Sequence, residues 1–310
     1  MLACHSPPPL QPGDELFVVA PSGALREWTA LQAGIVLWEA QGYRVKLLPG
    51  LDEQWGYLAG SDTHRRQQLL TALQAPQCRG ILCARGGFGG TRLLESWHWP
   101  PGQAKWLIGF SDITSLLWSF ANQGCGGIHG PLLTTLRQEP DWSRQRLFNW
   151  VAGREVAPLQ GQVWHPGRVS GPLLPANLTV ATHLLGTTHE PNLQGAILAL
   201  EDVTEAPYRL DRLLTHWRMM GKLAAIAGIA VGRFSRCDPP ENIPSLDVET
   251  VLRDRLCDLG IPVVAGLPFG HDGVNAALPV GAIATLDGNV GTLTLHRSAP
   301  ALDSPAKLEL

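Results

Sequence analysis

Short apolar runs alternate with segments of helical spacing through the first half of the chain, and this alternation limits the possible fold more than any other feature. The apolar runs predict strands at 15–20, 43–48, 80–84 and 105–110. The segments between them predict helices at 25–41, 64–73, from 91 and from 112. Strands that alternate with helices favour a doubly wound parallel sheet, which binds ligands at the carboxyl ends of its strands.

The second half of the chain predicts a β-rich arrangement. Strands are expected at 195–200, 224–231 and 262–267, with a hairpin at 280–286 and 291–296 that turns at Asp287-Gly288-Asn289. Helices are expected at 177–185, 208–220 and 246–259. Frequent glycine and proline between 138 and 171 indicate a linker. The predicted fold class is α/β, with a Rossmann- or flavodoxin-like domain over 1–150, a linker over 151–170 and a β-rich α+β domain over 171–310.

The composition describes a globular protein that needs no unusual partner. The 310 residues are 45% hydrophobic and 16% charged, and the net charge of -3 gives no reason to expect nucleic acid or an anionic membrane as a partner. No apolar run reaches the roughly 18 residues that span a bilayer, and the N-terminal segment 1–6 lacks the pattern of a signal peptide. The six cysteines form no C-x-x-C pair, so we expect reduced thiols in a cytoplasmic protein, with no disulfide framework, metal or cofactor.

The segment Gly109-Phe110-Ser111-Asp112-Ile113 stands where a predicted strand turns into a helix. A serine at such a turn can be exposed as a nucleophile, and the Asp112 N–H at the helix N-terminus points to where an oxyanion would form. Ile113 replaces the second glycine of the G-x-S-x-G hydrolase elbow. On this motif alone, a helix cap is the commoner role for a Ser-Asp pair.

A glycine-rich segment, Arg85-Gly86-Gly87-Phe88-Gly89-Gly90, follows the third predicted strand. Its glycines permit positive φ and close approach of a ligand to the backbone. The spacing fits neither G-x-G-x-x-G nor the P-loop, so a nucleotide site is not expected. An anion-binding nest of backbone N–H groups and a plain tight turn both remain open.

Two further residues at predicted strand ends complete a possible catalytic set. Glu201 follows an apolar strand and is suited to orient a histidine, although a loop cap is the commoner role for such a carboxylate. His271 lies in a glycine-flanked turn after another strand. Ser111, Glu201 and His271 would supply nucleophile, orienting acid and general base, in one of several chain orders that support this chemistry. Spacing alone leaves open whether the three meet.

Taken together, the motifs resemble those of the LD-carboxypeptidases, a family of serine peptidases that includes the microcin C self-immunity proteins. The resemblance runs from about Gly13 to Leu295. It rests on seven collinear motifs: Val18-Val19-Ala20-Pro21-Ser22-Gly23, Ala84-Arg85-Gly86-Gly87-Phe88-Gly89, Leu107-Ile108-Gly109-Phe110-Ser111-Asp112, His129-Gly130-Pro131, Leu200-Glu201-Asp202-Val203, Ala206-Pro207-Tyr208-Arg209-Leu210-Asp211-Arg212 and Gly270-His271.

This resemblance implies an N-terminal α/β domain with Ser111 as nucleophile and a C-terminal domain with His271 as base and Glu201 as its orienting acid. It also implies an oxyanion hole made by the N–H groups of Asp112 and of Gly86 or Gly87. The activity implied is removal of a terminal D-amino acid from an L,D-peptide bond, usually D-alanine from the muropeptide tetrapeptide recycled in the cytoplasm, by a homodimer. An exopeptidase must recognise a free carboxylate, and Arg85 is the candidate cation.

Two segments depart from the family pattern, namely Pro175-Ala176-Asn177-Leu178-Thr179 and Asp272-Gly273-Val274-Asn275. Both are expected near the substrate groove, so the substrate is less certain than the reaction. One alternative is an immunity-like hydrolase of an aminoacyl or peptidyl adenylate analogue, with Trp164 or Trp217 stacking on the base. The other is a non-catalytic peptide-binding module on the same scaffold, against which the intact Ser/Glu/His set argues.

Overall fold

The first half of the chain builds a parallel sheet, to which the second half adds one strand. The computed structural model describes residues 4–239, 241 and 243–297, so the outer ends of both predicted domains lie outside it. The strand order is β12-β5-β4-β3-β1-β2, in which β1 to β5 are parallel and β12 is antiparallel to β5. The strands are β1 Glu15–Val19, β2 Arg44–Leu47, β3 Cys78–Cys83, β4 Trp106–Gly109, β5 Ile128–His129 and β12 Leu278–Pro279.

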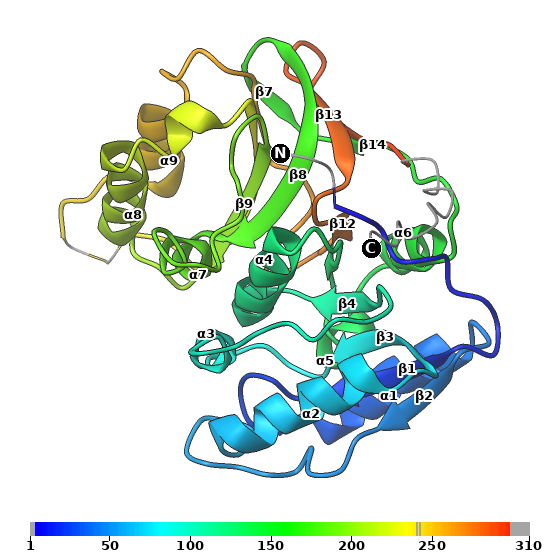
Figure 1. Cartoon of the computed structure of the whole chain (residues 1–310). Coiled ribbons are helices and arrows are strands. Elements are labelled where there is room, and N and C mark those ends of the chain that lie inside the picture. The colour runs from blue at the N-terminus through cyan, green and yellow to red at the C-terminus, as the bar shows by residue number, and fades with distance from the viewer. Residues whose placement is uncertain (1–3, 240, 242, 298–310) are drawn as a thin grey trace, which may run out of the picture.

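Helices cover both faces of this first sheet, which confirms the doubly wound arrangement (Figure 1). Successive residues of a strand point to opposite faces. Phe17 and Val19 accordingly pack with α2 Asp62–Gln74, α3 Gly90–Leu93 and α4 Thr114–Asn122. Leu16 and Val18 pack with the helices of the other face, α1 Trp28–Glu39, α5 Leu133–Leu136 and α6 Asp141–Val151.

The second sheet is mixed, in the order β6-β14-β13-β8-β9-β10-β11-β7. Its centre, β8 to β11, is parallel, and the outer strands are antiparallel. The strands are β6 Leu159–Gln160, β7 Gln162–His165, β8 Arg168–Asn177, β9 Ile197–Val203, β10 Gly228–Ser235, β11 Val263–Ala265, β13 Ile283–Asp287 and β14 Thr292–Leu295. The helices α7 Leu178–Thr182, α8 Pro207–Met219 and α9 Val248–Leu256 pack on one face, with a short turn, η2 Leu223–Ala225, before β10.

The segment 151–170, predicted as a linker, carries β6, β7 and the start of β8. Its glycines are needed where the chain runs close to other backbone. A Cβ on Gly161 would lie 2.4 Å from the Ala265 carbonyl oxygen, and Gly167 has a φ of +128°. These residues therefore belong to turns between strands of the second sheet, and the division into domains stays a prediction.

The remaining structural expectations concern cysteines and membrane spans. All six cysteines, at positions 4, 78, 83, 125, 237 and 257, are free thiols. Burial raises the pKa of Cys4 and of Cys237 to about 11, which keeps both protonated at neutral pH. Among the described residues, none of the helices combines the length and the apolar character required for crossing a bilayer.

Candidate active site

Ser111 lies directly after β4, on the short turn η1 Ser111–Ile113 that leads into α4. Its φ is +64°, a conformation that non-glycine residues rarely adopt and that costs of order 1–3 kcal/mol. The side chain is half-buried, whereas the rest of this helix start is buried. The tight turn therefore presents one hydroxyl at the carboxyl end of the sheet.

His271 and Glu201 form a hydrogen-bonded pair. His271 Nδ1 lies 2.7 Å from Glu201 Oε2, and the Glu201 side chain is fully buried at the end of β9. We assign the proton to Nδ1, because an ionised carboxylate only accepts hydrogen bonds, and this tautomer leaves Nε2 as an acceptor. Burial raises the pKa of Glu201, while the bond from His271 lowers it.

Phe110 brings the pair next to Ser111. The His271 ring packs against the ring of Phe110 with the centroids 4.7 Å apart, and Phe110 is the residue before Ser111. The structure therefore places Ser111, Glu201 and His271 in one region, although they come from two different sheets.

The predicted oxyanion turn touches Ser111. A Cβ built on Gly86 would lie 3.1 Å from Ser111 Cβ and 3.3 Å from Ser111 Oγ. Gly87 has a φ of +112°, and the Gly86 carbonyl accepts a hydrogen bond from Gly23 N at 3.0 Å. Within the described part of the chain, the N–H groups of Gly86 and Gly87 donate no hydrogen bond, and the Asp112 N–H belongs to a helix start. The Gly86 and Gly87 N–H groups beside Ser111 thus have no acceptor within the described protein.

The Asp112 side chain holds this turn in place, which the sequence did not indicate. Its Oδ2 accepts hydrogen bonds from Ser22 Oγ at 2.6 Å and from Gly90 N at 2.7 Å. The residue is 3% exposed, and burial raises the pKa of its carboxyl. Asp112 therefore connects three strand ends, those of β1, β3 and β4, at the site.

The Arg85 guanidinium is engaged away from the Ser111 turn. Nη1 donates to the Ala24 carbonyl at 2.7 Å, and Nε lies 3.5 Å from Glu27 Oε2. Arg233 on β10 is an exposed cation that borders the His271 turn, because a Cβ on Gly273 would lie 2.9 Å from Arg233 Cζ. Among the described residues no carboxylate lies within 4.0 Å of it.

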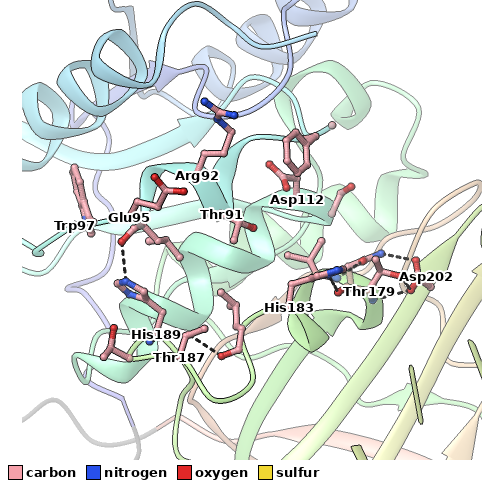
Figure 2. A pocket seen from close by; sticks show the side chains of 18 of the residues that line it. Thr91, Arg92, Glu95, Trp97, Asp112, Thr179, His183, Thr187, His189 and Asp202 are labelled. Atoms are coloured by element: carbon pink, nitrogen blue, oxygen red, sulfur yellow. Dashed lines mark hydrogen bonds between the residues drawn. The ribbon is translucent and has the colours of Figure 1, made fainter. Parts of the chain in front are cut away.

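A cavity of about 720 Å³ opens beside Ser111 and runs between α3 and α7. Figure 2 shows Thr91 and Arg92 on one wall and His183 and Thr187 on the other. His189 closes the far end, with Nε2 3.0 Å from the Leu94 carbonyl oxygen. The volume is within the range of small-molecule sites. No group of three or more His, Cys, Asp or Glu residues is placed to hold a metal in the described ranges.

Two polar groups lie beside the pair, in motifs that the sequence analysis named without giving these residues a role. Asp202 accepts hydrogen bonds from Asn177 Nδ2, Thr179 N and Thr179 Oγ1, at 3.0, 2.9 and 2.7 Å, and so ties β9 to the start of α7. His129 is fully buried near His271, and burial together with that neighbour lowers its pKa to about 3. The sequence signal for the first group was the departure from the family pattern at Asn177. The signal for the second was the motif His129-Gly130-Pro131, although His129 lies in the two-residue strand β5, which shows no periodicity.

The fold is that of a known family. The LD-carboxypeptidase N-terminal domain model matches residues 16–130, and the C-terminal domain model matches 170–286. The chain belongs to the LD-carboxypeptidase family, whose members are hydrolases.

Among its relatives is a Synechocystis protein named as a carboxypeptidase, which is 57% identical over 93% of this chain and 96% of its own length. The murein tetrapeptide carboxypeptidase of Pseudomonas aeruginosa is 34% identical over 90% of this chain and 95% of its own length.

Solved structures agree with this assignment. The muramoyltetrapeptide carboxypeptidase from Oxalobacter formigenes superposes with a TM-score of 0.79 at 28% identity, covering 91% of this chain and 97% of that one. The microcin C7 self immunity protein MccF has a TM-score of 0.83 at 18% identity, covering 96% of this chain and 99% of that one. At that identity, the likeness to MccF concerns the fold alone.

Proposed function

We propose that this protein is a serine-type LD-carboxypeptidase that releases D-alanine from the muropeptide tetrapeptide. The observation that carries the proposal is the placement of Ser111, on a tight turn bordered by Gly86, next to the His271–Glu201 pair. The names of the Pseudomonas and Oxalobacter relatives support a murein peptide as substrate. The family resemblance supports peptidoglycan recycling in the cytoplasm by a homodimer.

The chemistry begins at His271. Its Nε2 takes the Ser111 proton as the serine oxygen attacks the scissile carbonyl carbon, and buried Glu201 stabilises the resulting imidazolium. The carbonyl oxygen becomes an oxyanion that accepts hydrogen bonds from Gly86 or Gly87 and Asp112 N–H groups. Imidazolium then protonates the amine of the leaving D-alanine as the C–N bond breaks. A water molecule, deprotonated by His271, hydrolyses the acyl-enzyme and frees Ser111.

Recognition of the terminal carboxylate needs a cation near the leaving group. Arg85, the candidate from sequence, already contacts Ala24 and Glu27. Arg233 lies beside the His271 turn and forms no ion pair within 4.0 Å in the described ranges, although its charge lowers the pKa of Glu139. We therefore assign the terminal carboxylate to Arg233 and keep Arg85 as a support of the glycine-rich turn.

The test is incubation of the full-length chain with L-Ala-γ-D-Glu-meso-diaminopimelate-D-Ala and detection of free D-alanine by mass spectrometry. Ser111→Ala should abolish release while the thermal unfolding curve stays close to that of the wild type. Release at the wild-type rate by Ser111→Ala would refute the role of this serine. Release by neither protein would refute the substrate.

One observation favours a second candidate, the adenylate-analogue hydrolase. Phe88 is 50% exposed at the mouth of the cavity and packs edge-on against Tyr57 at 5.7 Å, so an aromatic face is available to a nucleobase. Trp217 is fully buried and the Trp164 ring is covered by Arg253 at 4.2 Å, which removes the tryptophans considered from sequence. Hydrolysis of an aminoacyl sulfamoyl adenosine, with the tetrapeptide left intact, would favour this candidate.

A further inference from the structure

The turn that presents His271 has a backbone in conformations that are stable only with support from neighbouring residues. Gly270, Asp272 and Gly273 have φ values of +122°, +50° and +146°. Glycine-rich backbone in such conformations loses much entropy on folding, so it keeps one conformation only where its surroundings fix it. The position of the His271 imidazole therefore depends on contacts from outside the turn.

Two side chains supply those contacts to the backbone of the turn. Ser235 Oγ on β10 donates to the His271 carbonyl oxygen at 2.6 Å. Asn275 Oδ1 accepts from Gly270 N at 3.1 Å, and Asn275 is 2% exposed. The ion pair of Arg236 with Asp272 is exposed, and such pairs add little to stability because water screens both charges. Backbone bonds from Arg233 N to the Phe269 carbonyl at 2.8 Å and from Ala276 N to the Pro268 carbonyl at 2.9 Å close the base of the turn. Within the turn, the N–H of Gly270, the residue before His271, is bound by one buried amide oxygen.

Asn275 is in turn held by a buried carboxylate from the first half of the chain. Glu139, 4% exposed and just before α6, accepts hydrogen bonds at Oε2 from Asn275 N at 3.0 Å and from Ser143 Oγ at 2.7 Å. Burial raises the pKa of Glu139, and the hydrogen bonds together with Arg144 and Arg233 lower it.

Both groups are buried at a free-energy cost. A carboxylate removed from water is expensive unless it is hydrogen-bonded, and Asn275 Nδ2 has no hydrogen-bond partner in the described part of the chain. An apolar pair of similar size would fill this space without that cost. Only the polar pair, however, makes both hydrogen bonds. Asn275 Oδ1 accepts from Gly270 N, and Glu139 accepts from the backbone N–H of Asn275 and so holds Asn275 in position.

We propose that Asn275 and Glu139 are positioning residues for His271, acting in the order Glu139, Asn275, Gly270, His271. The inference rests on the proposed role of His271 as the general base. The pair sets the orientation of the imidazole toward Glu201 and Ser111, and neither residue contacts the substrate. Because misplacement of a catalytic group by about 1 Å can cost about 100-fold in rate, loss of either contact acts on turnover more than on binding.

Two truncations and one conservative variant test the order of contacts. In the full-length chain, Asn275→Ala and Glu139→Ala should each lower kcat by about 10- to 100-fold and change KM by less than about threefold. Glu139→Gln keeps an acceptor oxygen and should retain kcat within about threefold. Asn289→Ala is the matched control, because Asn289 Oδ1 also accepts from a glycine N–H, that of Gly167 at 3.2 Å, in an exposed turn. This turn follows β13 beside the start of β8, whereas Glu201 pairs with the last residue of β8.

A second measurement separates positioning from general stability and needs no substrate. The proton of His271 Nδ1, bonded to Glu201 at 2.7 Å, should give a proton NMR resonance far downfield of the amides, assigned by its loss in His271→Ala. It should persist in Glu139→Gln and Asn289→Ala, and shift upfield or vanish in both truncations, well below their melting temperatures.

Each outcome bears on one proposal. Truncations that lower the melting temperature but keep kcat and the resonance would overturn positioning and leave Asn275 and Glu139 as ordinary structural residues. If one truncation does not fold, the other truncation and Glu139→Gln still test positioning, through kcat and the His271 Nδ1 proton resonance. Full tetrapeptide activity in His271→Ala would instead refute the proposed function, and an inactive wild type that shows the resonance would refute only the substrate.

Discussion

Replacing Gly86 by alanine adds one methyl group directly beside the proposed nucleophile. The new carbon would lie 3.1 Å from Ser111 Cβ and 3.3 Å from Ser111 Oγ, while its next neighbour, Leu132 Cδ1, is at an ordinary 3.6 Å. The first two distances are tighter than usual, so Ser111 must move by a few tenths of an ångström or the turn must shift. The methyl also occupies space that the substrate carbonyl needs next to the serine oxygen.

The expected loss is on the scale of losing one oxyanion donor. That loss costs about 100- to 1,000-fold in rate, or about 2.7–4 kcal/mol of transition-state stabilisation, and we expect the same range for kcat/KM of Gly86→Ala. The effect on folding should be small, since Gly86 does not have a positive φ and the two tight contacts require a shift of only a few tenths of an ångström.

The assay is D-alanine release alongside thermal unfolding, with Gly102→Ala as the matched control. Gly102 also lacks a positive φ, and a Cβ there meets nothing within 4 Å, so this variant should match the wild type in both measurements. Wild-type kcat/KM in Gly86→Ala would refute the reasoning that the turn borders the reacting atoms. A large fall in melting temperature would show that the activity loss has another cause.

Three further predictions follow from the same contacts. Glu201→Gln should lower kcat by about 100- to 10,000-fold, because an amide no longer stabilises the imidazolium, while circular dichroism stays unchanged. Arg233→Ala should raise KM by about tenfold or more and Arg85→Ala should raise it less, as steady-state kinetics would measure. Burial raises the pKa of Asp112 in the folded protein above its ordinary value of 3.8. At pH values between the ordinary pKa and the raised one, the folded protein binds a proton that the unfolded chain does not. The protonated Asp112 therefore contributes stability at low pH that is lost as pH rises. In urea unfolding, the wild type should therefore gain stability relative to Asp112→Asn as pH is lowered from 7 toward 4, and a constant difference would contradict the burial argument.

The sequence predicted the long, patterned elements well and the short strands poorly. β1, β3 and β4 lie where the apolar runs predicted them, because buried parallel strands are continuous apolar segments. β5 and β12 have only two residues each and cannot show a period of two. β8 contains Pro172 and Pro175, which normally argue against a central strand, yet it pairs with β9 and β13 on its two sides.

The catalytic candidates came from their positions at predicted strand ends and from the motif resemblance, and their contacts came only from the fold. Glu201 and His271 are 70 residues apart in the chain, and nothing in their local patterns indicates that they form a hydrogen bond. The supporting contacts are less visible still, because Ser22 and Asp112 are 90 residues apart and Glu139 and Asn275 are 136 apart. Local propensity carries no information on such pairs, whose contact is decided by how the two sheets meet.

The candidate site is assembled where the two sheets meet, so the distance between the proposed nucleophile and base depends on how the sheets are held together. Ser111 and the Gly86 turn belong to the first sheet, whereas Glu201 and His271 belong to the second, so any sliding of one sheet over the other would separate nucleophile and base. β12 opposes such sliding, because it continues the segment after the His271 turn and pairs with β5 of the first sheet. The Glu139–Asn275 contact opposes it again, three residues before β12. The segment that carries the proposed base is thus bound to the sheet that carries the proposed nucleophile, and the distance between the two groups depends on these joints rather than on the rigidity of either sheet.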